Sequence, residues 1–404
     1  MAPLLAAMSM VGPFSIDTMF PAFHTIEHEF GISPMAMQQS VSIYLAAFAF
    51  MALLHGALSD AFGRRSVLLT GMTIFGLASI GCALAPSLPV LLTFRAMQGL
   101  SAGAGMIIGR AIIRDRFEGA EATRLMSQVT LIFGIAPAIA PVFGGWMLDL
   151  HGWRAIFWSL VIYSIAIVGL CLIALPETHP RARRVRFSVG SLARGYRDVL
   201  MDRRCVLLAL SGALNFGAVF LYIASAPVIV LDWLRLDERQ FAWLFVPTIS
   251  GIMFGAWLAG RLAGVIRAEG VVRLGFIMVA AGSVFSFAVY RYLPPQLPWT
   301  VLPPGIVAIG SALCAPTVTL LMLDRFPLLR GTVASLQASI SIGFNALGSG
   351  LISPLVAARP AALSATSALI SLGALLMWLW YRRLPAEPAA VAVPLAADLP
   401  APGR

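Results

Sequence analysis

Two ionisable side chains lie inside long apolar stretches, where an ionisable group is costly and usually functional. Asp17 lies in GPFSIDTMFPAF, whereas the other 17 of the 18 acidic residues map outside the apolar stretches or to their ends. Arg95 is similarly isolated in LLTFRAMQG. Counted inward from His24 and Leu88, each lies seven positions deep, or ~10 Å at the helical rise. We therefore expect Asp17 and Arg95 to lie at matching depth and to pair.

The chemistry available to such a pair is reversible protonation. Removal from water favours the neutral form of a carboxyl group, whereas a nearby guanidinium favours the ionised form. A pair whose separation and water access change would therefore take up and release a proton. The alternative is a static ion pair that holds two helices together. We favour coupling, because a permanently buried pair brings little net stability.

A second charged cluster is expected in GALSDAFGRRSVLL. Its glycines permit a tight turn, and Asp60 can pair with Arg64 and Arg65 at the membrane surface. We interpret the cluster as a conformational latch. The alternative, a topology signal, explains the two arginines but neither Asp60 nor the glycines. The predicted latch residues are Gly56, Asp60, Gly63, Arg64, Arg65, Arg114 and Asp115.

Other kinds of chemistry find no support in the sequence. No nucleophile, His and carboxylate set gathers at one depth, which argues against an enzyme. The four cysteines are too scattered for a metal site or a disulfide framework; they are Cys82, Cys171, Cys205 and Cys314. The net charge of +10 comes from dispersed basic residues, which argues against nucleic-acid binding. We expect no metal and no cofactor, with a proton gradient as the energy source.

The elements that must position these residues are transmembrane helices. The chain is 59% hydrophobic and 11% charged, whereas soluble proteins are about 25% charged. Its apolar runs are roughly 20 residues long, the length that crosses about 30 Å of hydrocarbon. The predicted fold is therefore an all-α membrane protein with twelve transmembrane helices. The expected spans are 2–24, 35–58, 66–85, 88–111, 124–148, 154–175, 205–231, 241–264, 271–292, 299–323, 331–357 and 360–381.

An Arg-rich break divides the spans into two sets of six. We predict an N-terminal bundle at 1–176, a linker at 177–204, a C-terminal bundle at 205–384 and a disordered tail at 385–404. The linker contains an amphipathic stretch, 192–200, that can lie on the membrane surface. Asp115-Arg116-Phe117 recurs 209 residues later as Asp324-Arg325-Phe326. The repeat indicates two pseudo-symmetric six-helix bundles, an architecture suited to alternating access.

The arginines predict the orientation, since all 28 basic residues are Arg. Alternating the loops places 22 of them on the face that carries the linker and five on the opposite face, with Arg95 left in the membrane. The positive-inside rule then places the linker and both termini in the cytoplasm.

Several motifs resemble those of the major facilitator superfamily. The latch stretch matches G-x-L-[AS]-D-x-x-G-R-R without a mismatch, and Arg95 with Gln98 and Gly99 is similar to the fourth-helix R-x-x-Q-G motif. In GIAPAIAPVFGG, four residues resemble the fifth-helix antiporter motif, although Ala140 replaces the usual Gly. These four are Pro137, Pro141, Gly144 and Gly145.

More narrowly, SIDTMFPAF, RAIIRD and NFGAVFLYIASAPVIV resemble the bicyclomycin-resistance (Bcr/CflA) branch of drug/proton antiporters. The resemblance implies a proton-coupled multidrug exporter in the bacterial inner membrane. It also implies that Asp17 takes the place of the branch's first-helix acid. The implied partners are a small drug-like substrate, protons and membrane lipid, and we expect a monomer. The alternatives are a metabolite exporter or proton symporter of the same fold and, more remotely, a membrane receptor.

The resemblance further implies that the first, fourth, seventh and tenth helices line a substrate cavity. Aromatic and Met side chains there suit lipophilic compounds of varied shape, because they offer contact area without fixed hydrogen bonds. The alternative for each of them is a packing or lipid-facing role. The candidate cavity residues are Phe14, Met19, Met97, Asn215, Phe216, Phe220 and Tyr222.

Overall fold

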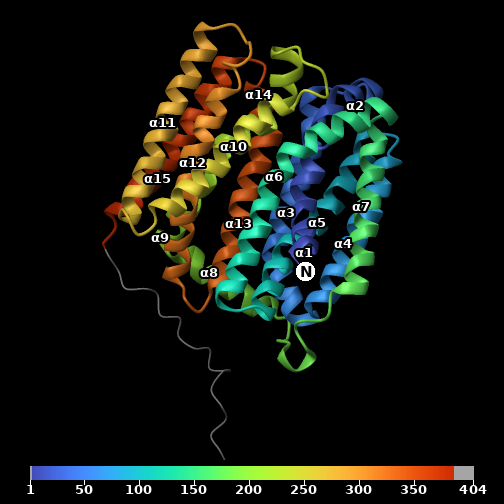
Figure 1. Cartoon of the computed structure of the whole chain (residues 1–404), viewed down its shortest axis with the longest axis vertical. Helices are drawn as coiled ribbons and strands as arrows, with labels where there is room; N and C mark the ends of the chain where they lie inside the picture. The colour runs from blue at the N-terminus through green and yellow to red at the C-terminus, as the bar shows by residue number, and fades with distance from the viewer. Residues whose placement is uncertain (1, 386–404) are drawn as a thin grey trace, which may run out of the picture.

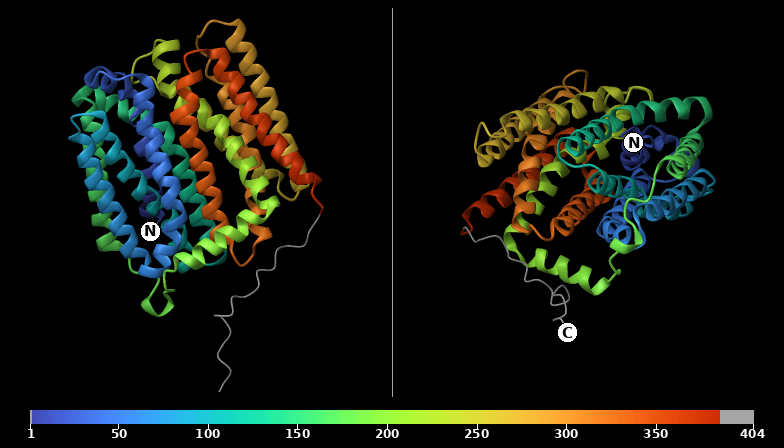
Figure 2. Two further views of the ribbon diagram at one scale, coloured as in Figure 1. Left: turned by 180° about the vertical axis from the view of Figure 1, so that it is seen from behind. Right: turned by 60° about the horizontal axis from the view of Figure 1, so that its bottom comes forward.

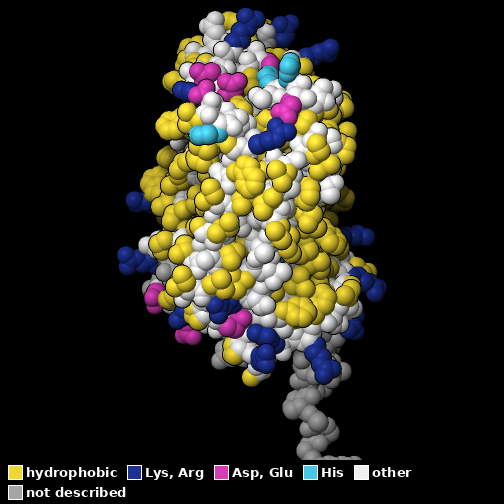
Figure 3. Space-filling view, turned by 90° about the vertical axis from the view of Figure 1, so that its right-hand side faces the viewer, with side chains coloured by type: hydrophobic (Ala, Val, Ile, Leu, Met, Phe, Trp, Pro, Cys, Tyr) yellow, Lys and Arg dark blue, Asp and Glu magenta, His cyan; other side chains and the backbone are white. Residues whose placement is uncertain are grey.

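The computed structural model of the protein describes residues 2–385, so the predicted tail falls outside the described residues except for Pro385. Within 2–385, twelve helices are long and apolar enough to cross a membrane. The predicted all-α class with twelve membrane-spanning helices is thereby confirmed. On the face shown in Figure 3, apolar side chains cover most of the middle of the molecule, and most of the charged side chains lie toward its two ends.

The first group of helices precedes the linker. Its members are α1 (Ala2–Asp17), η1 (Phe20–Ala22), α2 (Phe23–Phe30), α3 (Pro34–Phe62), α4 (Arg64–Ala83), α5 (Leu88–Arg116), α6 (Gly119–His151) and α7 (Trp153–Ala174). The linker contains η2 (Arg181–Arg183) and α8 (Val189–Met201). The second group comprises α9 (Arg203–Ala224), η3 (Val228–Trp233), α10 (Ala242–Leu262), α11 (Ala268–Tyr292), α12 (Leu302–Arg325), α13 (Arg330–Leu347), η4 (Gly348–Ile352), α14 (Ser353–Val356) and α15 (Pro360–Arg383).

Polar caps and prolines set several helix starts. The Ser33 hydroxyl accepts a hydrogen bond from the Ala36 backbone at 3.3 Å, and Pro34 occupies the first turn of α3. Asp202 caps α9 in the same way, since its carboxylate accepts from the Cys205 backbone at 2.8 Å. A first-turn Pro loses no helical hydrogen bond, and a capping oxygen satisfies a free N–H.

Three predicted spans are interrupted near the same end of the molecule. The first span breaks after Asp17 and continues through η1 and α2 to Phe30. The seventh gives way to the π-helix η3 directly after Pro227, and the eleventh to the π-helix η4 at Gly348. Proline removes a backbone donor and glycine lowers helix propensity, so the regular ladder is weakest at these residues.

The two groups of helices meet at one end and diverge toward the other (Figure 1). We call these the α2 end, where α2 and α14 lie, and the α8 end, where α8 and the described C-terminus lie. The helices of the two groups touch mainly where α3 packs on α13 and η4, and where α6 packs on α10.

The linker helix α8 lies across the α8 end and joins both groups (Figure 2). Its Tyr196 hydroxyl donates to the Leu53 carbonyl of α3 at 2.6 Å and lies 2.8 Å from the Ser335 hydroxyl of α13. Burial raises the pKa of Tyr196, so its hydroxyl keeps the proton that it donates. The α8 helix is therefore bonded to one helix from each group.

Candidate functional site

Asp17 and Arg95 are both buried, with exposed fractions of 4% and 0%. The expected contact between them is not formed, because no ion pair joins them among the ion pairs of the described residues. Both side chains lie in the first group of helices, but they are not bonded to each other. The prediction that they pair is therefore wrong for this conformation.

Neutral oxygen atoms surround the Arg95 guanidinium instead. Its Nη1 donates to the Gln98 side chain at 2.8 Å and to the Ser15 hydroxyl at 3.1 Å, and its Nε donates to the Ser40 carbonyl at 3.2 Å. The ring of Tyr44 lies 4.4 Å from the guanidinium carbon, a distance at which an aromatic face attracts a cation. Nη2 has no partner in the described chain. The charge of Arg95 is thus stabilised by dipoles and a π face.

The direction of the α1 side chains explains why Asp17 is not one of these partners. Successive helical residues are rotated by 100°, so Ser15 and Asp17 point to nearly opposite sides of α1. Arg95 contacts the Ser15 side. Asp17 is therefore turned away from the guanidinium at similar depth.

Tyr44 is a site residue that the sequence did not reveal. It is fully buried on α3, its hydroxyl donates to the Gly12 carbonyl at 3.3 Å, and it lies close enough to Asp17 and Arg95 to interact with both electrostatically. Only its depth in the second span pointed to it, and many apolar residues share that depth. Tyr44 therefore contacts Arg95 directly and lies within electrostatic range of Asp17.

The residues that resemble the antiporter motif lie on α6, the fifth membrane-spanning helix, between Asp17 and the second group of helices. A Cβ atom on Gly144 would overlap the backbone of Thr18, and one on Gly145 would overlap the backbone of Glu238. Pro137 and Pro141 lie inside the same helix, α6. Two successive glycines therefore bring α6 against the residue that follows Asp17 and against the other half of the molecule.

Polar contacts between the halves gather at the α2 end. Asp149 forms an ion pair with Arg239 beside the Gly145 contact. The Gln38 amide donates to the Ala224 carbonyl at 2.8 Å and accepts from the Ser349 hydroxyl at 3.2 Å. Each of these contacts joins a residue of the first group to one of the second, so the α2 end is closed.

Two of the predicted cavity residues pack inside their own bundles. The ring of Phe14 lies 5.6 Å from that of Phe143 and 6.0 Å from that of Tyr163. The Tyr222 hydroxyl lies 2.8 Å from the Ser286 hydroxyl of α11. These contacts match the packing alternative.

The other predicted cavity residues lie just after α1, on α5 and on α9. Met19 is fully buried just after α1, and Met97 is 37% exposed on α5. Asn215 donates to the Ser311 carbonyl of α12 at 3.2 Å. Phe216 and Phe220 lie on α9, with ring centroids 6.4 Å apart. The structure thus places the two phenylalanines together.

The predicted latch residues form a charge cluster around Arg64. Its Nη1 lies 2.5 Å from the Asp60 carboxylate and 2.6 Å from the Ser59 hydroxyl, and its Nε lies 3.0 Å from the Asp115 carboxylate. The Arg64 backbone donates to Glu177 at 3.0 Å, a residue that the sequence analysis did not include. The cluster joins α3, α4 and α5 to the start of the linker.

The remaining latch residues differ in their surroundings. Gly63 has a φ of 97°, a conformation that favours glycine. Arg65 donates to the Leu172 carbonyl at 2.7 Å. Arg114 is exposed with no bonded partner in the described chain, and a Cβ on Gly56 would meet nothing within 4 Å. The structure therefore brings Arg64, rather than Arg114, to the centre.

Replacing Arg64 by Ala is expected to destabilise the protein by about 1–3 kcal/mol, because two carboxylates and a buried hydroxyl lose their partner. Thermal unfolding of the purified protein in detergent measures this as a lower melting temperature. Arg114→Ala is the matched control, since it removes an exposed guanidinium from the neighbouring helix end. Equal melting temperatures for the two variants would contradict a structural role for the cluster.

The described residues offer no site for a metal, since no group of three or more His, Cys, Asp and Glu side chains is placed to bind one within 2–385. The ionisable groups of the site are one buried carboxyl group, a buried guanidinium and a buried tyrosine.

The chain is similar to known transporters in sequence and in fold. The sequence model described as Major Facilitator Superfamily matches residues 5–341. The chain is 30% identical over 329 residues to the multidrug resistance protein MdtM of Escherichia coli (strain K12), covering 80% of this chain and 78% of that one. It is 24% identical over 355 residues to the bicyclomycin resistance protein homolog of Haemophilus influenzae, covering 86% and 87%. A bacterial homolog to the human lysosomal transporter Spinster, in its inward-facing and occupied conformation, has a TM-score of 0.75 at 16% identity, covering 94% and 95%.

Proposed function

The chain belongs to the major facilitator superfamily and is a multi-pass membrane transporter, and from that premise we propose that it is a proton-coupled exporter of small amphipathic drugs. It acts by alternating access in the bacterial inner membrane, as a monomer with both termini in the cytoplasm. The names of its relatives, a multidrug resistance protein and a bicyclomycin resistance protein homolog, support drugs as the substrate class.

The observation that carries the proton coupling is the environment of Asp17. The residue is buried in a transmembrane helix, and no cation of residues 2–385 forms an ion pair with it while the α2 end is closed. An ionised carboxylate in such surroundings is costly. In this conformation Asp17 therefore holds the proton, and release toward the cytoplasm accompanies loading of the drug.

The adjacent glycines Gly144 and Gly145 connect the proposed proton site to the contact that closes the α2 end. Gly144 packs on the backbone directly after Asp17, and Gly145 packs on the opposite half. Any movement of α6 that opens the α2 end also shifts the contact beside Asp17. In the proposed cycle, opening that end gives Asp17 access to external water, where it is protonated again.

Arg95 has a different role from the one first expected. Its neutral partners keep the guanidinium fixed between α1, α3 and α5 while Asp17 is protonated. A deprotonated Asp17 would be attracted to this fixed charge across Tyr44. Arg95 thus supplies a positive potential that stabilises the ionised carboxylate when the proton leaves.

The direction of transport separates this proposal from a proton symporter, and the transported substrate separates it from a metabolite exporter. Expression in an exporter-deficient bacterium should raise the minimum inhibitory concentration of several lipophilic antibiotics at least fourfold, and should lower the amount of drug in the cells. A symporter would instead increase the cell content of its substrate. An unchanged susceptibility panel together with export of a polar metabolite would replace drugs as the substrate class.

A further inference from the structure

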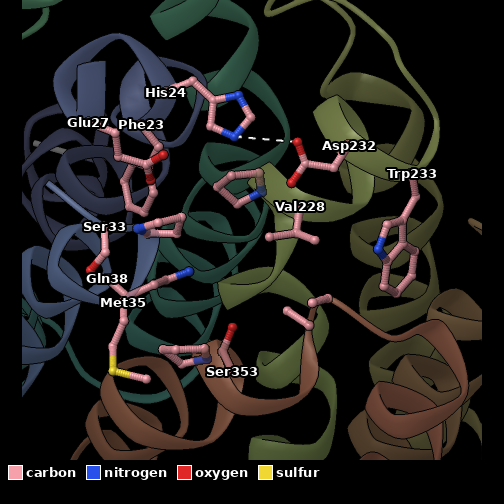
Figure 4. Close-up of a pocket in the computed structure, with 15 residues that line it drawn as sticks. Phe23, His24, Glu27, Ser33, Met35, Gln38, Val228, Asp232, Trp233 and Ser353 are labelled. Carbon is pink, nitrogen blue, oxygen red and sulfur yellow. Dashed lines mark ion pairs between the residues drawn. The ribbon is translucent and has the colours of Figure 1, made fainter. Parts of the chain in front are cut away.

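A cavity of about 430 Å³ lies between the two halves at the α2 end. One wall comes from α2 and the start of α3, and the other comes from η3 and α14 (Figure 4). The volume falls within the 300–1,000 Å³ range of small-molecule sites. Since both halves supply a wall, the cavity has this shape only while the α2 end is closed.

The cavity carries negative charge. Glu27 and Asp232 line it from opposite halves, and the His24 imidazole lies 3.6 Å from the Asp232 carboxylate. Glu27 lies within electrostatic range of both groups. No Lys or Arg is among the described residues that line it. With both carboxylates ionised, the net charge is negative whether or not the imidazole holds a proton.

Aromatic and thioether side chains complete the lining. Phe23 of α2 is buried and lines one wall together with Met35, which lies in the first turn of α3. Trp233 lines the opposite wall. The Trp233 ring is held edge-on against Tyr290, with centroids 5.6 Å apart. Its indole nitrogen is buried without a hydrogen-bond partner in the described chain.

We propose that this cavity is a second binding site, which takes lipophilic organic cations. The carboxylates attract the cationic centre, and the aromatic rings pack against it. The site is separate from Asp17 and Arg95. A ligand here contacts both halves at once, so it favours the closed α2 end over any conformation in which that end opens. Bound cation therefore slows the transport cycle. This last consequence alone rests on the proposed function.

Benzoylcholine is a suitable probe, since it combines a permanent cation, a ring and an ester carbonyl. Equilibrium dialysis with the purified protein should show saturable binding. The neutral ester 3,3-dimethylbutyl benzoate, in which carbon replaces the charged nitrogen, should bind at least tenfold more weakly. This comparison uses the unmodified protein, so it does not depend on how any variant folds.

Variants then locate the binding. Glu27→Gln combined with Asp232→Asn should weaken benzoylcholine binding at least tenfold, and Trp233→Phe should weaken it severalfold. Asp237→Asn removes an exposed carboxylate that follows η3 and does not line the cavity, and it should leave binding unchanged. Hydrogen exchange should slow at residues 34–42 and 346–356 when the unmodified protein binds the cation.

Equal binding of the charged and neutral esters would overturn the proposal, as would unchanged binding in the double variant. The proton-coupling proposal is tested separately by Asp17→Asn, which should bind benzoylcholine normally. Conversely, loss of coupling in Asp17→Asn says nothing against the cavity site. The two proposals can therefore fail independently.

Discussion

Asp17→Asn is expected to abolish substrate-induced proton release in everted membrane vesicles while the protein still folds and still binds drug. Asparagine has nearly the shape of a protonated aspartic acid but cannot exchange a proton. The buried site accepts a neutral side chain without cost, because no cation in the described part of the chain is paired with Asp17. The expected loss is complete within the detection limit of a fluorescent pH probe.

Asp198→Asn is the matched control, since Asp198 is an exposed carboxylate on α8. It should release protons at the rate of the unmodified protein. Drug binding to purified Asp17→Asn, followed by intrinsic fluorescence, shows whether that variant remains intact. Normal proton release from Asp17→Asn would remove Asp17 from the coupling mechanism.

Gly145→Ala should produce the second large effect, a shift away from the closed α2 end. The added Cβ would overlap the Glu238 backbone across the contact between halves. Overpacking costs about 1–3 kcal/mol, which shifts a two-state equilibrium by about 5–150-fold. Export should fall accordingly, because closure at this end becomes the unfavourable step.

A cysteine at Ser349, which is fully buried in the closed end, reports this shift. An impermeant maleimide should label Ser349→Cys faster when Gly145→Ala is also present. Gly169→Ala is the control, because a Cβ on Gly169 would meet nothing within 4 Å. Equal labelling rates with and without Gly145→Ala would show that this contact does not control closure.

The fold was largely predictable because apolar length dictates the number of spans. The sequence could not show where the spans break, since Pro227 and Gly348 permit a π-turn without requiring one. It also could not show that α2 continues beyond His24 as a separate amphipathic helix. Those interruptions shape the cavity at the α2 end, so its lining was not predictable either.

The depth of Asp17 and Arg95 along their helices was predictable from the sequence, but the direction in which each side chain points from its helix axis was not. Asp17 and Arg95 were expected to pair because they lie equally deep, yet Arg95 bonds to Ser15 on the other side of α1. The rotation of α1 is decided by packing against α5 and α6. A single sequence does not contain that information.

The same limit explains the residues that were missed or misplaced. Tyr44 and Glu177 belong to the sites only because α3 and the linker pass beside Arg95 and Arg64. Tyr222 was assigned to the cavity by its helix, although its hydroxyl faces Ser286. Motifs identified the charged partners more reliably than helix membership identified the aromatic ones.

The hydrogen bonds of Tyr196 limit how far the two halves of the molecule can separate at the α8 end. Because α8 is hydrogen-bonded to both halves, it restricts the angle through which they can rotate away from each other at that end. In the proposed alternating-access cycle, the width of the opening, and hence the largest cargo admitted, is then set outside the pathway itself. In that cycle, loss of the Tyr196 hydrogen bonds would alter which compounds enter without touching any residue that binds them.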